Sequence, residues 1–290
     1  FPTRRSSDLP LLHLTGQVEK AWLDADTGFI HETRDQLTFL KASSKRAYRI
    51  SNANQAVALL HKAIQDAQTP PCGPVSVEIP IDIQSVKIPL SLLTAPLKTP
   101  PVAEAEEAMV DALWAQLKQA KRPLLWLGGG ALESCEAVKT LADAGMTVIS
   151  STHGRGILPD SHRASLRAFH NSPSVEALIS QCDFTLVAGS RLRSNETRSW
   201  TLELPAPRVQ IDIDPAAASR NYLMDNTLVA DCSAFLDALA ERAQGRIWGD
   251  ARWDSQIKEA VAMAEQGLRE QCGDYARLND AIAQALPENG

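Results

Sequence analysis

The chain has 290 residues, of which 44% are hydrophobic and 22% are charged, and its formal net charge is −6 at pH 7. This length allows two domains, and the composition is ordinary for a soluble globular protein. The acidic balance argues against a nucleic-acid-binding surface, and the sequence contains no apolar run of the roughly 18 residues needed to cross a bilayer.

The first nine residues, 1–9, read as the in-frame translation of a common sequencing-adapter oligonucleotide. A basic targeting peptide is the alternative, but no apolar segment follows these residues. We therefore expect residues 1–9 to be an artefact of assembly and the chain to be truncated at both ends.

The five cysteines are dispersed, odd in number and free of C-x-x-C pairs. This pattern is typical of buried, reduced thiols, and it predicts a cytoplasmic protein. A metal or redox site is the alternative. The residues are Cys72, Cys135, Cys182, Cys232 and Cys272.

Residues 10–88 show the pattern of an α/β domain. Two short apolar runs next to glycines are typical of buried parallel strands, and apolar residues at helical spacing lie between them. Ser51 or Asn52 can cap that helix, because a short polar side chain accepts from the free amides of the first turn. The predicted strands are 10–16 and 75–79, and the predicted helix is 53–67.

Four prolines fall between residues 89 and 101, and no period of 2 or 3.6 residues persists there. Proline can neither continue a helix nor donate to a strand ladder. Residues 89–104 are therefore predicted to be an extended linker that separates two domains.

Strand and helix patterns alternate from residue 105 to residue 245, which predicts a doubly wound α/β domain with a parallel sheet. Further helical patterns occupy 247–271 and begin again at residue 275. The predicted strands are 123–127, 147–150, 184–188, 208–213 and 227–230, and the predicted helices are 105–120, 134–144, 174–181 and 233–243.

Polar residues and glycines stand at three of these strand ends, where ligands bind in open parallel sheets. The amides of residues 128–130 can approach a phosphate, although a tight structural turn explains the glycines equally well. Asp212 and Asp214 can accept from a ribose or an adenine, or can cap a turn. Arg191 offers a planar fork to an anion, whereas Arg193 is interpreted as a surface charge. The convergence of these ends predicts a nucleotide site.

Two groups of short motifs are shared with a known superfamily. The first group is Gly16-Gln17-Val18, His31-Glu32-Thr33 and the segment 73–82, Gly-Pro-Val-Ser-Val-Glu-Ile-Pro-Ile-Asp. The second is the glycine run 128–130, Gly154-Arg155-Gly156, Gly189-Ser190-Arg191, Asp212-Ile213-Asp214-Pro215 and Ala230-Asp231. Together these motifs resemble the thiamine-diphosphate enzymes that act on 2-oxo acids, with acetolactate synthase the best-known member.

The resemblance implies a domain order and a chemistry. Residues 10–88 would be the later part of a pyrimidine-binding domain, 105–245 the central domain, and 246–290 a linker and the first helix of a diphosphate-binding domain. The parent enzyme would use thiamine diphosphate and Mg²⁺ to decarboxylate a 2-oxo acid such as pyruvate and to ligate the product to a second 2-oxo acid. The catalytic Glu would lie upstream and the metal motif downstream, so no catalytic or metal residue is assigned here and the chain alone is expected to be inactive.

In acetolactate synthases the corresponding central-domain motifs contact a non-redox FAD. The resemblance therefore implies an FAD site. ADP at this place, or an empty crevice, is the alternative for a related decarboxylase. The implied residues are Gly128, Gly129, Gly130, Thr152, Gly189, Arg191, Asp212, Ile213 and Asp231.

Two departures from acetolactate synthase favour a simple 2-oxo acid decarboxylase as the alternative. Ile30-His31-Glu32 stands where those synthases carry Phe-Gln-Glu, so His31 replaces a glutamine, and residues 166–171 replace a Met-Leu-Gly-Met-His-Gly segment. The substrate-side candidates are Gln17, His31 and Lys45. The alternative for His31 is a surface histidine, and the alternative for Lys45 is a solvated lysine. The family also implies a homodimer or homotetramer. A non-catalytic nucleotide-binding module remains the alternative from another class.

Overall fold

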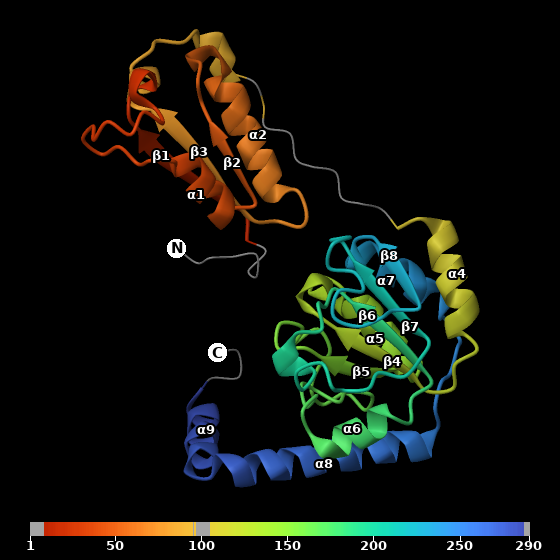
Figure 1. Cartoon of the computed structure of the whole chain (residues 1–290). Coiled ribbons are helices and arrows are strands. Elements are labelled where there is room, and N and C mark those ends of the chain that lie inside the picture. Colours follow the sequence, from red (N-terminus) through yellow and green to blue (C-terminus); the bar gives the residue numbers. More distant parts are fainter. Residues whose placement is uncertain (1–8, 95, 97–104, 287–290) are drawn as a thin grey trace. The chain divides into compact units, whose positions relative to one another are not determined.

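A computed structural model describes residues 9–94, 96 and 105–286 (Figure 1). The chain divides into two compact units, Phe1–Val102 and Ala103–Gly290, and each is described by itself. Most of the adapter-like segment and most of the predicted linker lie outside the described residues. The described part of the linker is not extended throughout, because Leu90–Thr94 forms a short 3-10 helix, η3, in a stretch without proline.

The first unit contains a three-stranded parallel sheet. Strands β1 (Leu11–Gln17) and β2 (Arg46–Arg49) flank the central strand β3 (Pro74–Pro80). The strands predicted at 10–16 and 75–79 are therefore confirmed. All three strands run in the same direction, so their carboxyl ends meet at one edge of the sheet.

The two faces of this sheet differ in polarity. Val75 and Val77 of β3 are fully buried in an apolar cluster with helix α2 (Ala56–Gln68), which was predicted at 53–67 and is preceded by a 3-10 turn, η2 (Ala53–Gln55). Ser76 and Glu78 point to the other face and are also buried. Buried polar groups need partners, so this face depends on hydrogen bonds and ion pairs rather than on apolar packing.

Several short elements were not predicted from the sequence. They are strand β2, helix α1 (Gln36–Ser43), helix α3 (Ile81–Gln84) and the 3-10 turn η1 (Lys20–Trp22). Strand β2 has only four residues and two of them are arginines, so its conformation is decided by pairing with β3 rather than by an apolar pattern. Helix α1 buries a single residue, Leu40, and begins at Asp35, whose carboxylate accepts from the backbone N–H of Thr38.

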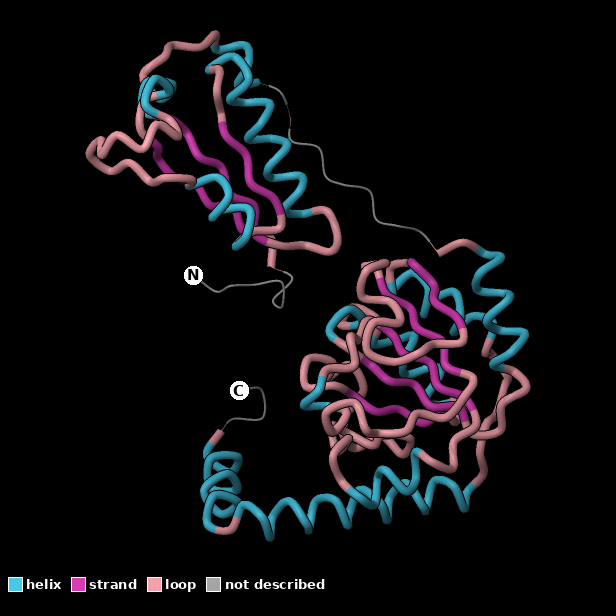
Figure 2. The backbone as a smooth tube through the Cα atoms, in the orientation of Figure 1, coloured by secondary structure: helices cyan, strands magenta, loops and turns pink. Residues whose placement is uncertain are grey.

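The second unit is built on a five-stranded parallel sheet in the order β5-β4-β6-β7-β8. Its helices lie on both faces, which confirms the predicted doubly wound α/β fold (Figure 2). The strand bounds are β4 (Pro123–Leu127), β5 (Thr147–Ser150), β6 (Phe184–Ala188), β7 (Arg208–Asp212) and β8 (Asn226–Val229).

Helices α4 (Glu107–Leu117), α5 (Cys135–Asp143) and α7 (Cys232–Arg242) share one apolar cluster with the sheet. Helices α6 (Pro173–Ile179) and α8 (Ala251–Cys272) share the cluster on the opposite face. Trp253 and Ile257 of α8 are buried in that second cluster, so the core of this unit extends beyond residue 245. The last described helix is α9 (Asp274–Ala285).

Within the described residues, no helix combines the length and the apolarity needed to span a membrane. All five cysteines are free thiols, but only Cys182 and Cys232 are buried, and Cys135 is exposed. The expectation of buried thiols therefore holds for two of the five. Burial raises the pKa of Cys182 to about 12 and also raises the pKa of Cys232, so both thiols are protonated at neutral pH.

Candidate nucleotide-binding crevice

The carboxyl ends of β4 and β6 form the switch point of the second sheet. From β4 the chain moves to β5 on one side, and the later strands β6, β7 and β8 follow on the other side. In open α/β sheets, ligands bind in the crevice at such a point. Gly128 directly follows β4 and Gly189 directly follows β6, so two of the predicted glycine sites lie at this switch point, where a crevice is expected.

The glycines hold the two strand ends in close contact. Gly128 and Gly130 donate their backbone N–H groups to the carbonyls of Ala188 and Gly189, at 2.8 and 3.1 Å. A Cβ added at Gly128 would lie 2.1 Å from the Gly189 carbonyl oxygen, and Gly189 itself has a φ of +60°. The tight turn foreseen as the alternative is therefore present. Gly129, between the two anchored amides, is half-buried and follows the end of β4.

The loop after β5 reaches the same region. Its Thr152 is exposed, and the backbone N–H of Thr152 donates to Glu196 Oε1 at 3.1 Å. Glu196 belongs to a short turn after β6, η5 (Ser194–Glu196), and only 2% of it is exposed. The buried carboxylate thus ties the loop after β5 to the loop after β6. Nothing in the local sequence pattern indicated this role for Glu196.

Two arginines follow β6. Arg191 is half-buried and lies 4.0 Å from the Asp214 carboxylate. Arg193 is also half-buried, and its Nη1 lies 3.2 Å from Nδ1 of His153 in the loop after β5. Arg193 is therefore not the solvated surface charge that the sequence indicated, and His153 has an arginine beside it that sequence reasoning did not find.

Carboxylates stand at the ends of β7 and β8. Asp212 is buried and its Oδ1 accepts from the backbone N–H of Asp214 at 2.9 Å. Asp231 begins helix α7, where Oδ1 accepts from the amides of Ser233 and Ala234. Asp212 thus has the turn role foreseen as its alternative, and Asp231 caps a helix. Ile213 beside Asp212 is half-buried. Arginines therefore follow β6 and carboxylates follow β7 and β8, and Arg191 forms an ion pair with Asp214 between these strand ends.

The substrate-side candidates all lie in the first unit, and Lys45 lies apart from Gln17 there. Gln17 ends β1 and is buried, with Oε1 accepting from the Val18 N–H. His31 is exposed in the loop before α1, with a left-handed φ of 66°. Lys45 precedes β2 at the opposite end of the sheet from Gln17, and its ammonium donates to the carbonyls of Asp66 and Thr69. Burial lowers the pKa of Lys45.

A buried Trp–His contact lies in the second unit, and the sequence did not reveal it. The rings of Trp126 on β4 and His170 are 6.1 Å apart, and both residues are buried. Among the described residues, Trp126 Nε1 and His170 Nδ1 have no hydrogen-bond partner. Burial lowers the pKa of His170, while the nearby Glu196 carboxylate opposes this effect. His170 is therefore a neutral core histidine.

His170 should make the second unit less stable in mild acid. The pKa of His170 is lower in the folded chain than in the unfolded chain. Its contribution to the free energy of unfolding is therefore fully present above a pH of about 6.5 and is lost as the pH falls below that value. The slope is limited to about 1.4 kcal/mol per pH unit for one proton. Urea unfolding between mild acid and neutral pH should show a flatter pH dependence for His170→Phe. His61→Gln, in the first unit, should leave the dependence unchanged. Equal slopes for wild type and His170→Phe would refute this assignment.

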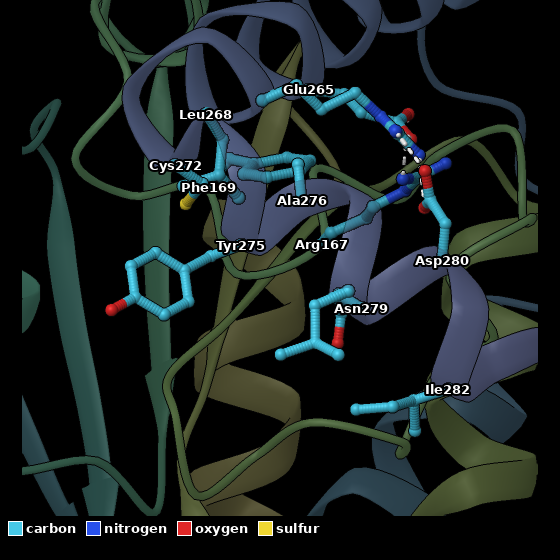
Figure 3. Close-up of a pocket in the computed structure, with 12 residues that line it drawn as sticks. Arg167, Phe169, Glu265, Leu268, Cys272, Tyr275, Ala276, Asn279, Asp280 and Ile282 are labelled. Atoms are coloured by element: carbon cyan, nitrogen blue, oxygen red, sulfur yellow. Dashed lines mark hydrogen bonds and ion pairs between the residues drawn. The ribbon is translucent and has the colours of Figure 1, made fainter.

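A separate cavity of about 470 Å³ lies between α8, α9 and the loop after β5 (Figure 3). Its charged groups are paired with one another: Arg167 with Glu265, and Arg269 with Asp280. The remaining lining is mostly apolar, with Phe169, Leu268, Cys272, Tyr275, Ala276, Leu278 and Ile282 beside Asn279. None of the predicted site residues lines this cavity, so it is distinct from the crevice at the strand ends.

The sheet order and the helices on both faces define a doubly wound α/β domain. Residues 110–239 match the family described as the thiamine pyrophosphate enzyme central domain. Most of the second unit therefore matches the central domain of thiamine pyrophosphate enzymes, the family that the motifs indicated.

Similarity to individual proteins extends over nearly the whole chain. The chain is 28% identical to the acetolactate synthase isozyme 1 large subunit of Escherichia coli, over 98% of its length and 51% of that protein. It is 26% identical to the acetolactate synthase large subunit of Corynebacterium glutamicum, over 97% of the chain and 46% of that protein. It is 27% identical to a probable 2-ketoarginine decarboxylase of Pseudomonas aeruginosa, over 97% of the chain and 51% of that protein. The chain thus spans about half the length of the curated relatives it matches.

Proposed function

We propose that the chain is part of a thiamine-diphosphate-dependent enzyme that decarboxylates a 2-oxo acid such as pyruvate and ligates the product to a second 2-oxo acid. The match of residues 110–239 to the thiamine pyrophosphate enzyme central domain carries this proposal. The similarity to acetolactate synthase large subunits over nearly the whole chain supports it. We further propose a cytoplasmic homodimer or homotetramer as the parent enzyme.

The described residues are assigned to binding rather than to the chemical step. When bound, thiamine diphosphate supplies the electron sink for the loss of carbon dioxide. Within the described ranges, no group of three or more His, Cys, Asp or Glu side chains is placed to hold a metal ion. We assign no metal ligand and no catalytic step to these residues. We propose that the first unit contributes Gln17 and His31 to the substrate side.

The crevice at the strand ends is proposed to hold a nucleotide, either FAD or ADP. Its side chains fit such a ligand because half-buried arginines and the carboxylates of Asp212 and Asp214 both stand at these strand ends. Arginine forks suit a phosphate, and carboxylates accept from ribose hydroxyls. The proposed residues are Gly128, Gly129, Gly130, Thr152, Gly189, Arg191, Asp212, Ile213 and Asp231.

A decarboxylase without carbon–carbon bond formation is the second candidate. The similarity to a probable 2-ketoarginine decarboxylase over 97% of the chain favours it. His31 adds to this candidate, because an exposed imidazole on a loop can interact with a substrate differently from a glutamine.

The test uses the full-length protein with thiamine diphosphate and Mg²⁺. Carbon dioxide release and acetolactate formation are measured from pyruvate, and carbon dioxide release is also measured from a guanidino 2-oxo acid. Acetolactate formation supports the first candidate, whereas carbon dioxide release without a ligated product supports the second. Failure to turn over any 2-oxo acid would refute both. The 290-residue chain alone is expected to be inactive, so turnover by it would contradict the assignment of its residues to binding.

A further inference from the structure

Two side chains from different loops meet at the switch point. His153 follows β5 and Arg193 follows β6, and their Nδ1 and Nη1 atoms are 3.2 Å apart. A guanidinium group has donors only, so Nδ1 of His153 is the acceptor and the imidazole proton lies on Nε2. The pair therefore combines an arginine fork with a second N–H donor on the far side of the imidazole ring.

Contacts on both sides fix the position of this pair. A Cβ added at Gly129 would lie 3.2 Å from the Cβ of His153, so the His153 side chain leans against the glycine run. Gly128 and Gly130 anchor that run to the end of β6. The His153 loop is also held to the turn after Arg193, through the Thr152 amide and the Glu196 carboxylate. The pair is thus built into the region where β4, β5 and β6 end.

The chemistry of the pair suits an oxyanion. A planar guanidinium matches two oxygens of a phosphate, and charge-assisted hydrogen bonds of this kind are the strong ones. Carboxylates of Asp212 and Asp231 stand at the ends of β7 and β8, on the other side of β6. Neighbouring strands are about 4.8 Å apart. A nucleotide with its phosphates near β5 and β6 would therefore extend its ribose toward the carboxylates.

We propose that His153 and Arg193 form a phosphate clamp for the diphosphate group of a nucleotide. The clamp rests on the proposed use of the crevice as a nucleotide site and assigns two residues to it that lie outside the motifs discussed above. In the clamp, Arg193 donates from its fork and His153 donates from Nε2 to the same diphosphate group. Because the pair recognises the phosphates and not the nucleoside, it distinguishes ADP from adenosine.

The test is a calorimetric titration of the 290-residue chain with ADP, adenosine, FAD and inorganic phosphate, with folding checked by circular dichroism. ADP should bind the wild-type chain more tightly than adenosine. Arg193→Gln should weaken ADP binding by about tenfold or more, because a hydrogen bond to a charged group is lost, and should leave adenosine binding unchanged. His153→Gln should weaken ADP binding less. Arg252→Gln, which removes the same charge from an exposed position on α8, should change nothing.

The titrations with FAD and with inorganic phosphate show which kind of phosphate group the pair recognises. An equal loss of FAD and ADP affinity in Arg193→Gln supports recognition of a diphosphate bridge, and a loss for ADP alone supports a terminal phosphate. Competition of inorganic phosphate with ADP in the wild type but not in Arg193→Gln supports the clamp as well.

Three results would overturn the clamp: unchanged ADP binding in Arg193→Gln, an equal loss for ADP and adenosine, or no ADP binding by the folded wild-type chain. Turnover of a 2-oxo acid by the full-length protein is measured independently. Failure of the clamp and failure of the proposed function are therefore distinguishable.

Discussion

Replacing Gly128 by alanine is expected to lower the free energy of unfolding of the second unit by about 3 kcal/mol. The new methyl group would lie 2.1 Å from the Gly189 carbonyl oxygen and 2.5 Å from the Ser190 Cα. Both neighbours are backbone atoms, so the clash is relieved only by separating the ends of β4 and β6. That separation also breaks the hydrogen bond from the Gly128 N–H to Ala188.

Tryptophan fluorescence during urea unfolding measures this effect, because only Trp22 of the six tryptophans lies in the first unit. The matched control is Gly267→Ala in helix α8, where an added Cβ meets nothing within 4 Å. Alanine should stabilise that helix by roughly 0.5–1 kcal/mol. Equal effects of the two substitutions would show that the contact between the strand ends does not constrain residue 128.

The strands of the second sheet could be predicted from the sequence because their pattern is local. Every residue of β4, β5 and β6 is buried, so each strand is an unbroken stretch of buried residues bounded by turn residues. The predicted bounds of these three strands agree with the structure. Strand β2 could not be found in this way, since its arginines adopt an extended conformation only through pairing with a strand nearly thirty residues further along the chain.

The candidate site was predictable only to the level of strand ends. Parallel strands place their carboxyl ends together, so the sequence indicated that residues 128–130, Gly189 and Asp212 border one region. It did not indicate that Arg193 contacts His153 or that Glu196 supports Thr152. These contacts join loops some forty residues apart, and side-chain conformations in the folded state determine them.

One signal in the sequence was available and was not used. The alternation of residues 75–79, Val-Ser-Val-Glu-Ile, has a period of two, which is typical of a strand with two different faces. The structure places Val75 and Val77 on the apolar face and Ser76 and Glu78 on the polar face. On the polar face, the hydroxyl groups of Ser76 and Ser44 form a hydrogen bond. A buried glutamate at the centre of a sheet then requires a cationic partner.

That partner makes Glu78→Gln the second substitution with a large expected effect. The Glu78 side chain is fully buried, forms an ion pair with Nε of Arg49 on β2, and accepts from Nε2 of Gln36 on α1 at 3.2 Å. The Arg49 side chain is only 17% exposed, and removing its buried partner leaves a poorly solvated charge. We expect the first unit to lose about 3 kcal/mol, near the lower end for a broken buried pair, because Arg49 keeps its contact with Asp24.

Hydrogen–deuterium exchange of the β3 amides measures this loss separately from the second unit. The double variant Glu78→Met with Arg49→Met should recover most of the stability, since replacing both partners of a buried pair by apolar residues is often nearly neutral. The matched surface control is Arg34→Gln, which removes a pair with Asp26 in which both side chains are largely exposed, and it should change nothing measurable. If the double variant is as unstable as Glu78→Gln alone, the loss of stability arises from the packing around residue 78 and not from the poorly solvated charge of Arg49.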